Sequence, residues 1–291
     1  MFEKVVLATD LTPAWEEIVA CAAEFKTLGA REFILAHVIT VKFLGGMEAA
    51  LKAEAEPKLA AQKQQLEAQG FRVQVELVSG LPAFALNEVA RRHEAHLLVV
   101  GPQKTSRWQE RLLGSVTSAV LHHAQFPLLL LKARITEDQP EGSCRLKAKE
   151  LLRHVLLPTD FSDIADRAAM VLEHLASRGL ARVTVVNALD VPGGEAYPPG
   201  FQEMAVAQAQ SQLAAWEERL RQAGIPQVDT VFDPGRPLPA VLKLLEKEDI
   251  SLIVMGTQGK GFVREIFLGS VAHNVARLAP CPVLLLPPAK R

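Results

Sequence analysis

The feature that most constrains this chain is that it repeats itself once, in order, along its whole length. The first matching pair reads KVVLATDLT and HVLLPTDFS. The matching segments are, in chain order, 4–12 with 154–162, 31–39 with 182–190, 79–101 with 234–256, and 125–132 with 280–287. A tandem repeat in a chain of 291 residues predicts two domains of ordinary size that share one fold.

The repeat also places the domain boundaries. Between the two copies lies RITEDQPEGSCRLKAKE, which is charged, contains Pro and Gly, and has no apolar period. Such a segment is typical of a linker. We therefore predict domains at 1–133 and 152–291, joined by a linker at 134–151.

Within each copy, short apolar runs alternate with helical patterns. In the first copy we predict strands at 4–8, 32–39, 71–78, 96–100 and 126–131, and helices at 13–28, 47–69, 82–93 and 115–124. Five strands that alternate with four helices predict βαβ units, and therefore a parallel, doubly wound five-stranded sheet with helices on both faces.

The strand patterns predict which strands lie at the edges. The third strand, FRVQVELV, alternates strictly between apolar and polar residues, as a half-exposed edge strand does. The fifth strand of each copy is apolar throughout, and an apolar edge must be covered. Pairing of the two fifth strands would cover both edges and make the chain a pseudo-dimer. The alternative is that a helix or loop covers each edge.

Composition narrows the function classes. The formal net charge is −1, so no basic surface indicates a nucleic-acid partner, and any phosphate recognition must be local. The longest apolar runs, such as LLLL at 128–131, are too short to cross a membrane, and MFEKVVLATD does not resemble a signal peptide. Three cysteines without metal spacing favour free thiols in the cytoplasm.

The stretch GTQGKGFVREIFLGS, residues 256–270, carries the clearest sign of a binding site. Gly256 follows the fourth strand, where ligands of such sheets bind, and a glycine there lets a ligand approach the backbone. Gly259 allows a tight turn whose N–H groups form an anion nest. Gly269 and Ser270 open the last helix, with Ser270 as the predicted N-cap and the helix dipole favouring a phosphate. These features predict a polyphosphate clamp.

Two common phosphate motifs are absent from this stretch. A Walker A loop needs Gly-Lys-Ser/Thr in succession, whereas Gly261 precedes Phe262. The GxGxxG dinucleotide pattern is absent as well. The spacing G-x2-G-x9-G-S, with PTDFS near the domain start and a closing PVLLL strand, instead resembles the universal stress protein family. The resemblance covers each copy once and implies adenine nucleotide alpha hydrolase-like sandwiches.

The resemblance implies a wider site in the second copy. Asp160, preceded by Pro158 and Thr159, would lie near the ribose and phosphates and help to hold Mg²⁺. Its alternative role is that of a helix N-cap or turn residue. The backbone at Ala188 would read adenine. Met255 and Val271 would line the site, although both suit a core position equally well. The implied ligand is ATP with Mg²⁺, and ADP and AMP remain open.

The first copy departs from this pattern. Asp10, Val38, Gly101, Gly114 and Ser115 match, but Lys104 stands where the second glycine belongs. A side chain at a position that needs positive φ costs about 1 kcal/mol or more, so the nest would be lost. Alternatively, the lysine reaches a phosphate or fills the pocket. The remaining interpretation is a decayed site that is kept for its fold.

No catalytic motif accompanies the glycine pattern. The sequence has no GxSxG, no HExxH and no Cys/His cluster. We therefore predict an ATP-binding stress-response regulator with at most slow hydrolysis. Two alternatives stay open: a slow ATPase or phosphotransferase in which Asp160 positions metal or water, and a nucleotide-free scaffold for a partner protein or small molecule. The regulatory partner is unknown, and a homodimer remains an option.

Overall fold

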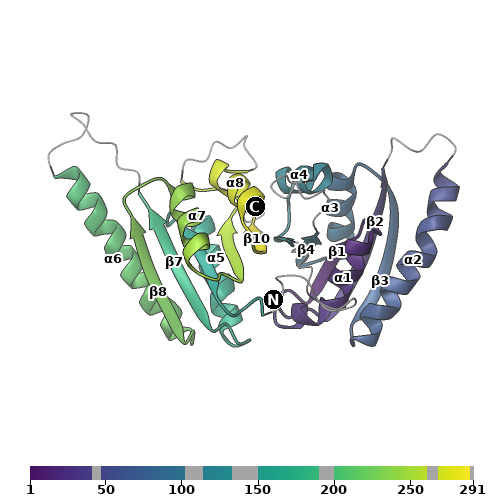
Figure 1. Ribbon diagram of the computed structural model, residues 1–291, viewed down its shortest axis with the longest axis horizontal. Coiled ribbons are helices and arrows are strands. Elements are labelled where there is room, and N and C mark those ends of the chain that lie inside the picture. Colours follow the sequence, from purple (N-terminus) through teal and green to yellow (C-terminus); the bar gives the residue numbers. More distant parts are fainter. Residues whose placement is uncertain (41–46, 102–113, 133–149, 190–199, 261–267, 289–291) are drawn as a thin grey trace. The chain divides into compact units, whose positions relative to one another are not determined.

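The computed structural model describes residues 1–40, 47–101, 114–132, 150–189, 200–260 and 268–288. The chain divides into two compact units, unit 1 at Met1–Glu150 and unit 2 at Leu151–Arg291 (Figure 1). Most of the predicted linker lies outside the described residues. Each unit is an α/β body that contributes five described strands.

Unit 1 follows the predicted alternation closely. Its described elements are β1 (Lys4–Ala8), α1 (Pro13–Ala20), a 3-10 helix η1 (Ala22–Lys26), β2 (Glu32–Thr40), α2 (Glu48–Ala68), β3 (Arg72–Gly80), α3 (Pro82–Arg92), β4 (Leu97–Val100), α4 (Ser115–His122) and β5 (Leu128–Leu130). The strands are parallel in the order β3-β2-β1-β4-β5. The predicted first helix, 13–28, is divided into α1 and the short η1.

Unit 2 repeats this arrangement. Its described elements are β6 (Val155–Thr159), α5 (Asp163–Ala176), β7 (Arg182–Ala188), α6 (Phe201–Gln222), β8 (Gln227–Asp233), α7 (Pro237–Lys247), β9 (Leu252–Gly256), α8 (Ser270–Leu278) and β10 (Val283–Leu286). The strands are again parallel, in the order β10-β9-β6-β7-β8.

Helices cover both faces of the sheet in unit 2. Helix α5 packs against α6, and both contact strands, while α7 packs against α8 in a second layer that contacts β7 and β10 (Figure 1). Strands β9 and β10 are buried along their whole length, as continuous apolar runs require when both faces are covered. This confirms the predicted doubly wound α/β class.

The edge prediction is confirmed for the third strand. Strand β3 ends the order in unit 1 and carries several exposed or half-buried residues, including Arg72 and Gln74. The fifth strands, β5 and β10, are buried throughout. Pairing between these two strands, and with it the pseudo-dimer, remains a prediction.

The order of strands in unit 2 reverses between β6 and β9, and a proline marks this point. The chain runs from β6 to β7 and β8, then returns to β9 on the other side of β6. Pairing of β6 with β9 ends at Leu156 with Ile253, whereas in unit 1 the pairing of β1 with β4 continues to Ala8 with Val100. Pro158 stands at the position of Ala8 and has no N–H to donate. The ladder therefore stops early at the switch point, where ligands bind in such folds.

Two expectations about cysteines and membranes can be compared with the structure. Cys21 is disulfide-bonded, so the prediction of a free thiol is wrong for this residue. Cys281 is a buried thiol, and Cys144 lies outside the described residues. The cysteines therefore no longer support a cytoplasmic location. Among the described residues, no helix combines the length and the apolar character needed to cross a bilayer.

Candidate functional site

The structure brings most of the predicted residues of unit 2 to one edge of its sheet. Thr159 ends β6 and pairs with Asn187, so Ala188 at the end of β7 lies level with Asp160. Gly256 ends β9, and Ser270 begins α8. Because parallel strands share one carboxyl edge, these segments surround the switch point together.

Asp160 holds this edge together through both of its carboxylate oxygens. Oδ1 accepts the N–H of Ser162 at 3.0 Å, which forms an Asx turn into α5. Oδ2 accepts the N–H of Lys260 at 2.6 Å, across the switch point. The side chain of Ser162, and not that of Asp160, caps α5 by accepting the N–H of Ala165. Asp160 is thus a turn residue that also clasps the start of the glycine-rich loop.

The clasp explains Gly259, although not in the way the sequence suggested. Its backbone does not lie in the left-handed region, so the prediction that this position needs positive φ is wrong. A Cβ on Gly259 would instead overlap Oδ2 of Asp160. The glycine is needed for space. The clasp also commits the N–H of Lys260 to the carboxylate of Asp160, so this part of the predicted nest already holds an internal anion.

A glycine at position 256 is likewise required for space. A Cβ there would lie 2.5 Å from Cγ2 of Ile164 on α5, which is far inside van der Waals contact. Close packing of β9 against α5 therefore requires a glycine here, and close approach of a ligand to the backbone of Gly256 remains a prediction. Gly101 of unit 1 repeats this, because a Cβ there would meet Trp15 and Ile18 of α1 at 2.8 and 2.7 Å.

The far end of the loop returns to its beginning. The N–H of Gly269 donates to the carbonyl of Thr257 at 2.7 Å, which closes the loop at its base. Gly269 is the N-cap of α8, and no side chain caps this helix. The prediction that Ser270 is the N-cap is therefore wrong, since Ser270 is the first helical residue. Without a side-chain cap, the first N–H groups of α8 remain available to an anion.

The remaining predicted residues take ordinary positions around this edge. Met255 is buried, and Val271 is half-buried in the first turn of α8. Thr159 is buried, and its hydroxyl accepts the N–H of Phe161 at 2.9 Å. One residue was missed: the amide of Asn187 donates to the carbonyl of Thr159 at 2.8 Å. The only sequence signal for it was its place at the end of a strand.

Unit 1 retains the turn at its own carboxyl edge. Asp10 accepts the N–H of Thr12 at 3.0 Å and its hydroxyl at 2.6 Å. Val38 lies in β2 one residue beyond His37, whose ring contacts the carbonyl of Thr9 at 2.8 Å, as Asn187 contacts Thr159. Gly114 is the N-cap of α4 and Ser115 its first residue, again without a side-chain cap. Lys104 lies outside the described residues.

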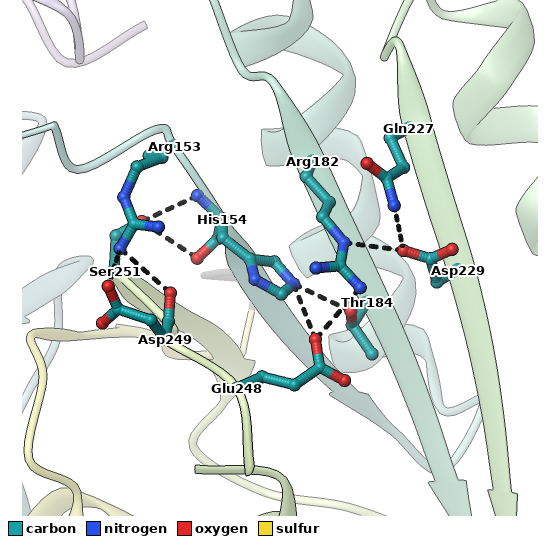
Figure 2. Close-up of polar contacts among 9 residues, drawn as sticks. All are labelled: Arg153, His154, Arg182, Thr184, Gln227, Asp229, Glu248, Asp249 and Ser251. Atoms are coloured by element: carbon teal, nitrogen blue, oxygen red, sulfur yellow. Dashed lines mark hydrogen bonds and ion pairs between the residues drawn. The ribbon is translucent and has the colours of Figure 1, made fainter. Parts of the chain in front are cut away.

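A dense charged network lies at the opposite, amino edge of unit 2 (Figure 2). The imidazole of His154 is buried, lies 2.9 Å from the hydroxyl of Thr184, and faces the carboxylate of Glu248 at 3.5 Å. Arg182 joins Glu248 to Asp229 at 3.1 and 2.7 Å. This network fastens the starts of β6, β7 and β8 to the end of α7.

The network lowers the pKa of both His154 and Asp229, which favours the neutral form of the histidine and the charged form of the aspartate. Burial lowers the pKa of His154, and the nearby charges of Arg182 and Arg153 lower it further against the opposing effect of Glu248 and Asp229. Burial acts to raise the pKa of Asp229, but the hydrogen bond and charge of Arg182 outweigh it, so that this pKa is lowered. At neutral pH, His154 is therefore neutral and Asp229 is charged.

Asp160 is the candidate metal ligand at the carboxyl edge of unit 2. Within the described ranges, no group of three His, Cys, Asp or Glu side chains is placed to hold a metal ion. Mg²⁺ does not need such a cage, because it keeps several waters and is held by one or two carboxylates plus substrate phosphates. Asp160, whose oxygens retain free lone pairs beyond their two N–H contacts, fits this requirement.

Fold and site together define a class: two doubly wound α/β units in tandem, each with an aspartate turn after its first strand and a glycine-marked edge at the switch point. The family model described as the universal stress protein family matches residues 1–132 and 152–287. The chain therefore belongs to the universal stress protein family, as a tandem two-domain member.

Individual relatives agree with this assignment. A universal stress protein of Thermus aquaticus is 37% identical over 136 residues, covering 47% of this chain and 99% of that protein. One from Mycobacterium tuberculosis (strain H37Rv) is 30% identical over 196 residues, covering 66% of this chain and 61% of its own length. The crystal structure of an Archaeoglobus fulgidus universal stress protein covers 99% of both chains at 24% identity with a TM-score of 0.78, which shows the same fold. In broad terms, the protein thus has a stress-response role.

Proposed function

We propose that unit 2 binds an adenine nucleotide, with ATP as the preferred ligand, and that binding sets the state of a stress-response regulator. The observation that carries this proposal is the closed base of the glycine-rich loop. Lys260 is clasped to Asp160 at one end, and Gly269 is bonded to Thr257 at the other. The end of the loop therefore returns to its beginning at the uncapped start of α8, and Asp160 holds Lys260 beside the switch point.

Charge supports a role for Mg²⁺ in this proposal. A triphosphate beside Asp160 would be repelled by the carboxylate, since like charges at close range oppose one another. A divalent cation held by Asp160 and the phosphates would remove this repulsion. Asp160 would then act as the protein ligand, with Pro158, Thr159, Ala188, Met255 and Val271 shaping the surrounding pocket.

Regulation would follow from binding alone. A ligand that binds the folded state stabilises it by RT ln(1 + [L]/Kd), so cellular nucleotide levels would determine how firmly the loop and α8 are held. We expect hydrolysis to be slow, since both carboxylate oxygens of Asp160 already accept N–H groups and are not poised to activate water. A cytoplasmic location, a homodimer and a regulatory protein partner belong to this proposal as further expectations.

The direct test is to identify what the purified full-length protein carries. The protein is denatured, and the released small molecules are separated and identified by mass spectrometry, with calorimetric titration of ATP and Mg²⁺ in case the ligand is lost on purification. We expect an adenine nucleotide, and ADP or AMP would fit the same site. If no nucleotide is released and ATP produces no binding heat, the proposal is wrong.

One observation favours a second candidate function, a scaffold that binds a partner protein or small molecule. Leu81, the N-cap of α3, and Phe84 in its first turn are large apolar residues with 58% and 59% of their surface exposed. At the corresponding positions, unit 2 carries Arg236 and Pro239. Leu81→Arg would weaken capture of a partner under this alternative without changing ATP binding in unit 2.

A further inference from the structure

The glycine-rich loop of unit 2 begins with a lysine that is tethered twice to the aspartate turn. The backbone N–H of Lys260 donates to Asp160 at 2.6 Å. Its ammonium lies 5.8 Å from the centroid of the Phe161 ring and makes no ion pair with a described residue. Lys260 is exposed, so its side chain rests on an aromatic face beside the site and can leave it for a stronger anionic partner.

The ring under Lys260 is held in place by a second aromatic residue. Phe161 and Trp216 of α6 meet edge to face, with their ring centroids 5.5 Å apart. Trp216 in turn lies under the guanidinium of Arg219, which pairs with Asp166 and Glu173 on α5. The position of the Phe161 ring is thus fixed from both α5 and α6.

The two units share the aspartate turn, but the aromatic pair occurs in unit 2 and not at the matching positions of unit 1. Phe161 has φ of 58°, and its counterpart Leu11 has φ of 59°, so both units adopt the same left-handed turn. The long helices α2 and α6 are each followed by a positive-φ glycine, Gly70 and Gly224. Gln62 and Trp216 each lie eight residues before that glycine, so Gln62 is the counterpart of Trp216. The turn therefore forms without the rings. The pair Phe161 and Trp216 occurs in the unit with the complete glycine pattern.

We propose that Lys260 is the side chain that binds the phosphates of the ligand, and that Phe161 and Trp216 are positioning residues that hold it at the mouth of the loop. This inference rests on the nucleotide site proposed for unit 2. A polyphosphate placed between Gly259 and the start of α8 would lie beside Asp160, and the exposed Lys260 supplies a positive charge at that point. The aromatic platform limits where this charge can rest before the ligand arrives.

The test compares ATP with adenosine, which lacks phosphates, in calorimetric titrations of the full-length protein. We expect Lys260→Ala to weaken ATP binding roughly tenfold, as for loss of a charged hydrogen-bonding contact, and to leave adenosine binding unchanged. The dependence of ATP affinity on salt should also become shallower. Lys243→Ala, which removes an exposed charge from α7, is the matched control and should change neither ligand.

The positioning residues are tested by variants that keep the fold. Phe161→Leu copies unit 1 and should weaken ATP binding but not adenosine binding, whereas Phe161→Tyr keeps an aromatic ring and should retain the ATP affinity of the unmodified protein. Unchanged ATP affinity in Lys260→Ala, or equal losses for ATP and adenosine, would overturn the inference while leaving the nucleotide site intact. If the unmodified protein binds no ATP at all, the proposed function is wrong and this inference falls with it.

Discussion

Substituting Gly259 by Ala tests the account of the glycine-rich loop at its narrowest point. The added methyl would overlap Oδ2 of Asp160, so either the carboxylate turns away or the loop moves. Both responses break the 2.6 Å bond from the N–H of Lys260. A hydrogen bond to a charged group contributes about 1.5–3 kcal/mol, and each 1.4 kcal/mol corresponds to about a tenfold change in affinity. If ATP needs the clasped loop, we expect its affinity to fall about 10- to 100-fold.

The assay is calorimetric titration with ATP and Mg²⁺, together with thermal unfolding. Gly179→Ala is the matched control: its φ is 92°, with open space around a new methyl, and it lies after α5. An alanine there is strained by about 1 kcal/mol without touching the site, so stability should fall and ATP affinity should not. Gly259→Lys, which copies position 104, should bind at least as poorly as Gly259→Ala. If Gly259→Ala bound ATP as the unmodified protein does, the steric explanation would be refuted.

Two further predictions concern titration and charge. The stability of unit 2 should fall as pH is lowered below about 6.5, because His154 has a lowered pKa in the folded state and the unfolded imidazole takes up its proton first. Urea unfolding at several pH values measures this dependence. A His154→Leu variant that kept the full dependence of stability on pH would contradict the assignment. Asp160→Asn replaces one acceptor oxygen by a donor, so it should lower stability by about 1–3 kcal/mol and remove the dependence of ATP affinity on Mg²⁺. Identical titrations with and without Mg²⁺ in the unmodified protein would count against a metal at Asp160, and rapid phosphate release that Asp160→Asn abolishes would favour the ATPase alternative.

The elements of this fold could be predicted because they depend on local patterns. Continuous apolar runs identified β9 and β10, and the alternation in FRVQVELV identified the edge strand β3. Such periods report burial on one or both faces of a strand directly. Because both units carry the same order of apolar runs and helical patterns, each copy also supports the assignment of elements in the other.

The reasons for the glycines could not be predicted in the same way, because they depend on what other elements bring nearby. Gly256 and Gly259 are excluded from carrying a side chain by Ile164 and Asp160, which are far away in sequence. A sequence pattern shows that a glycine is present but not whether φ or space requires it. The contact of Phe161 with Trp216 is of the same kind, since no local period links a turn to the middle of a distant helix.

The duplication itself allows fold and function to be separated at this edge. Both units keep the aspartate turn, the left-handed residue after it, and a side chain that contacts the carbonyl at the end of the first strand, through His37 in unit 1 and Asn187 in unit 2. Features shared by both copies are sufficient to build the edge of the sheet. The platform under Lys260 is not shared, because Leu11 replaces Phe161. A residue that only one copy requires is better explained by a ligand than by the fold, and unit 1 therefore serves as an internal comparison for Phe161.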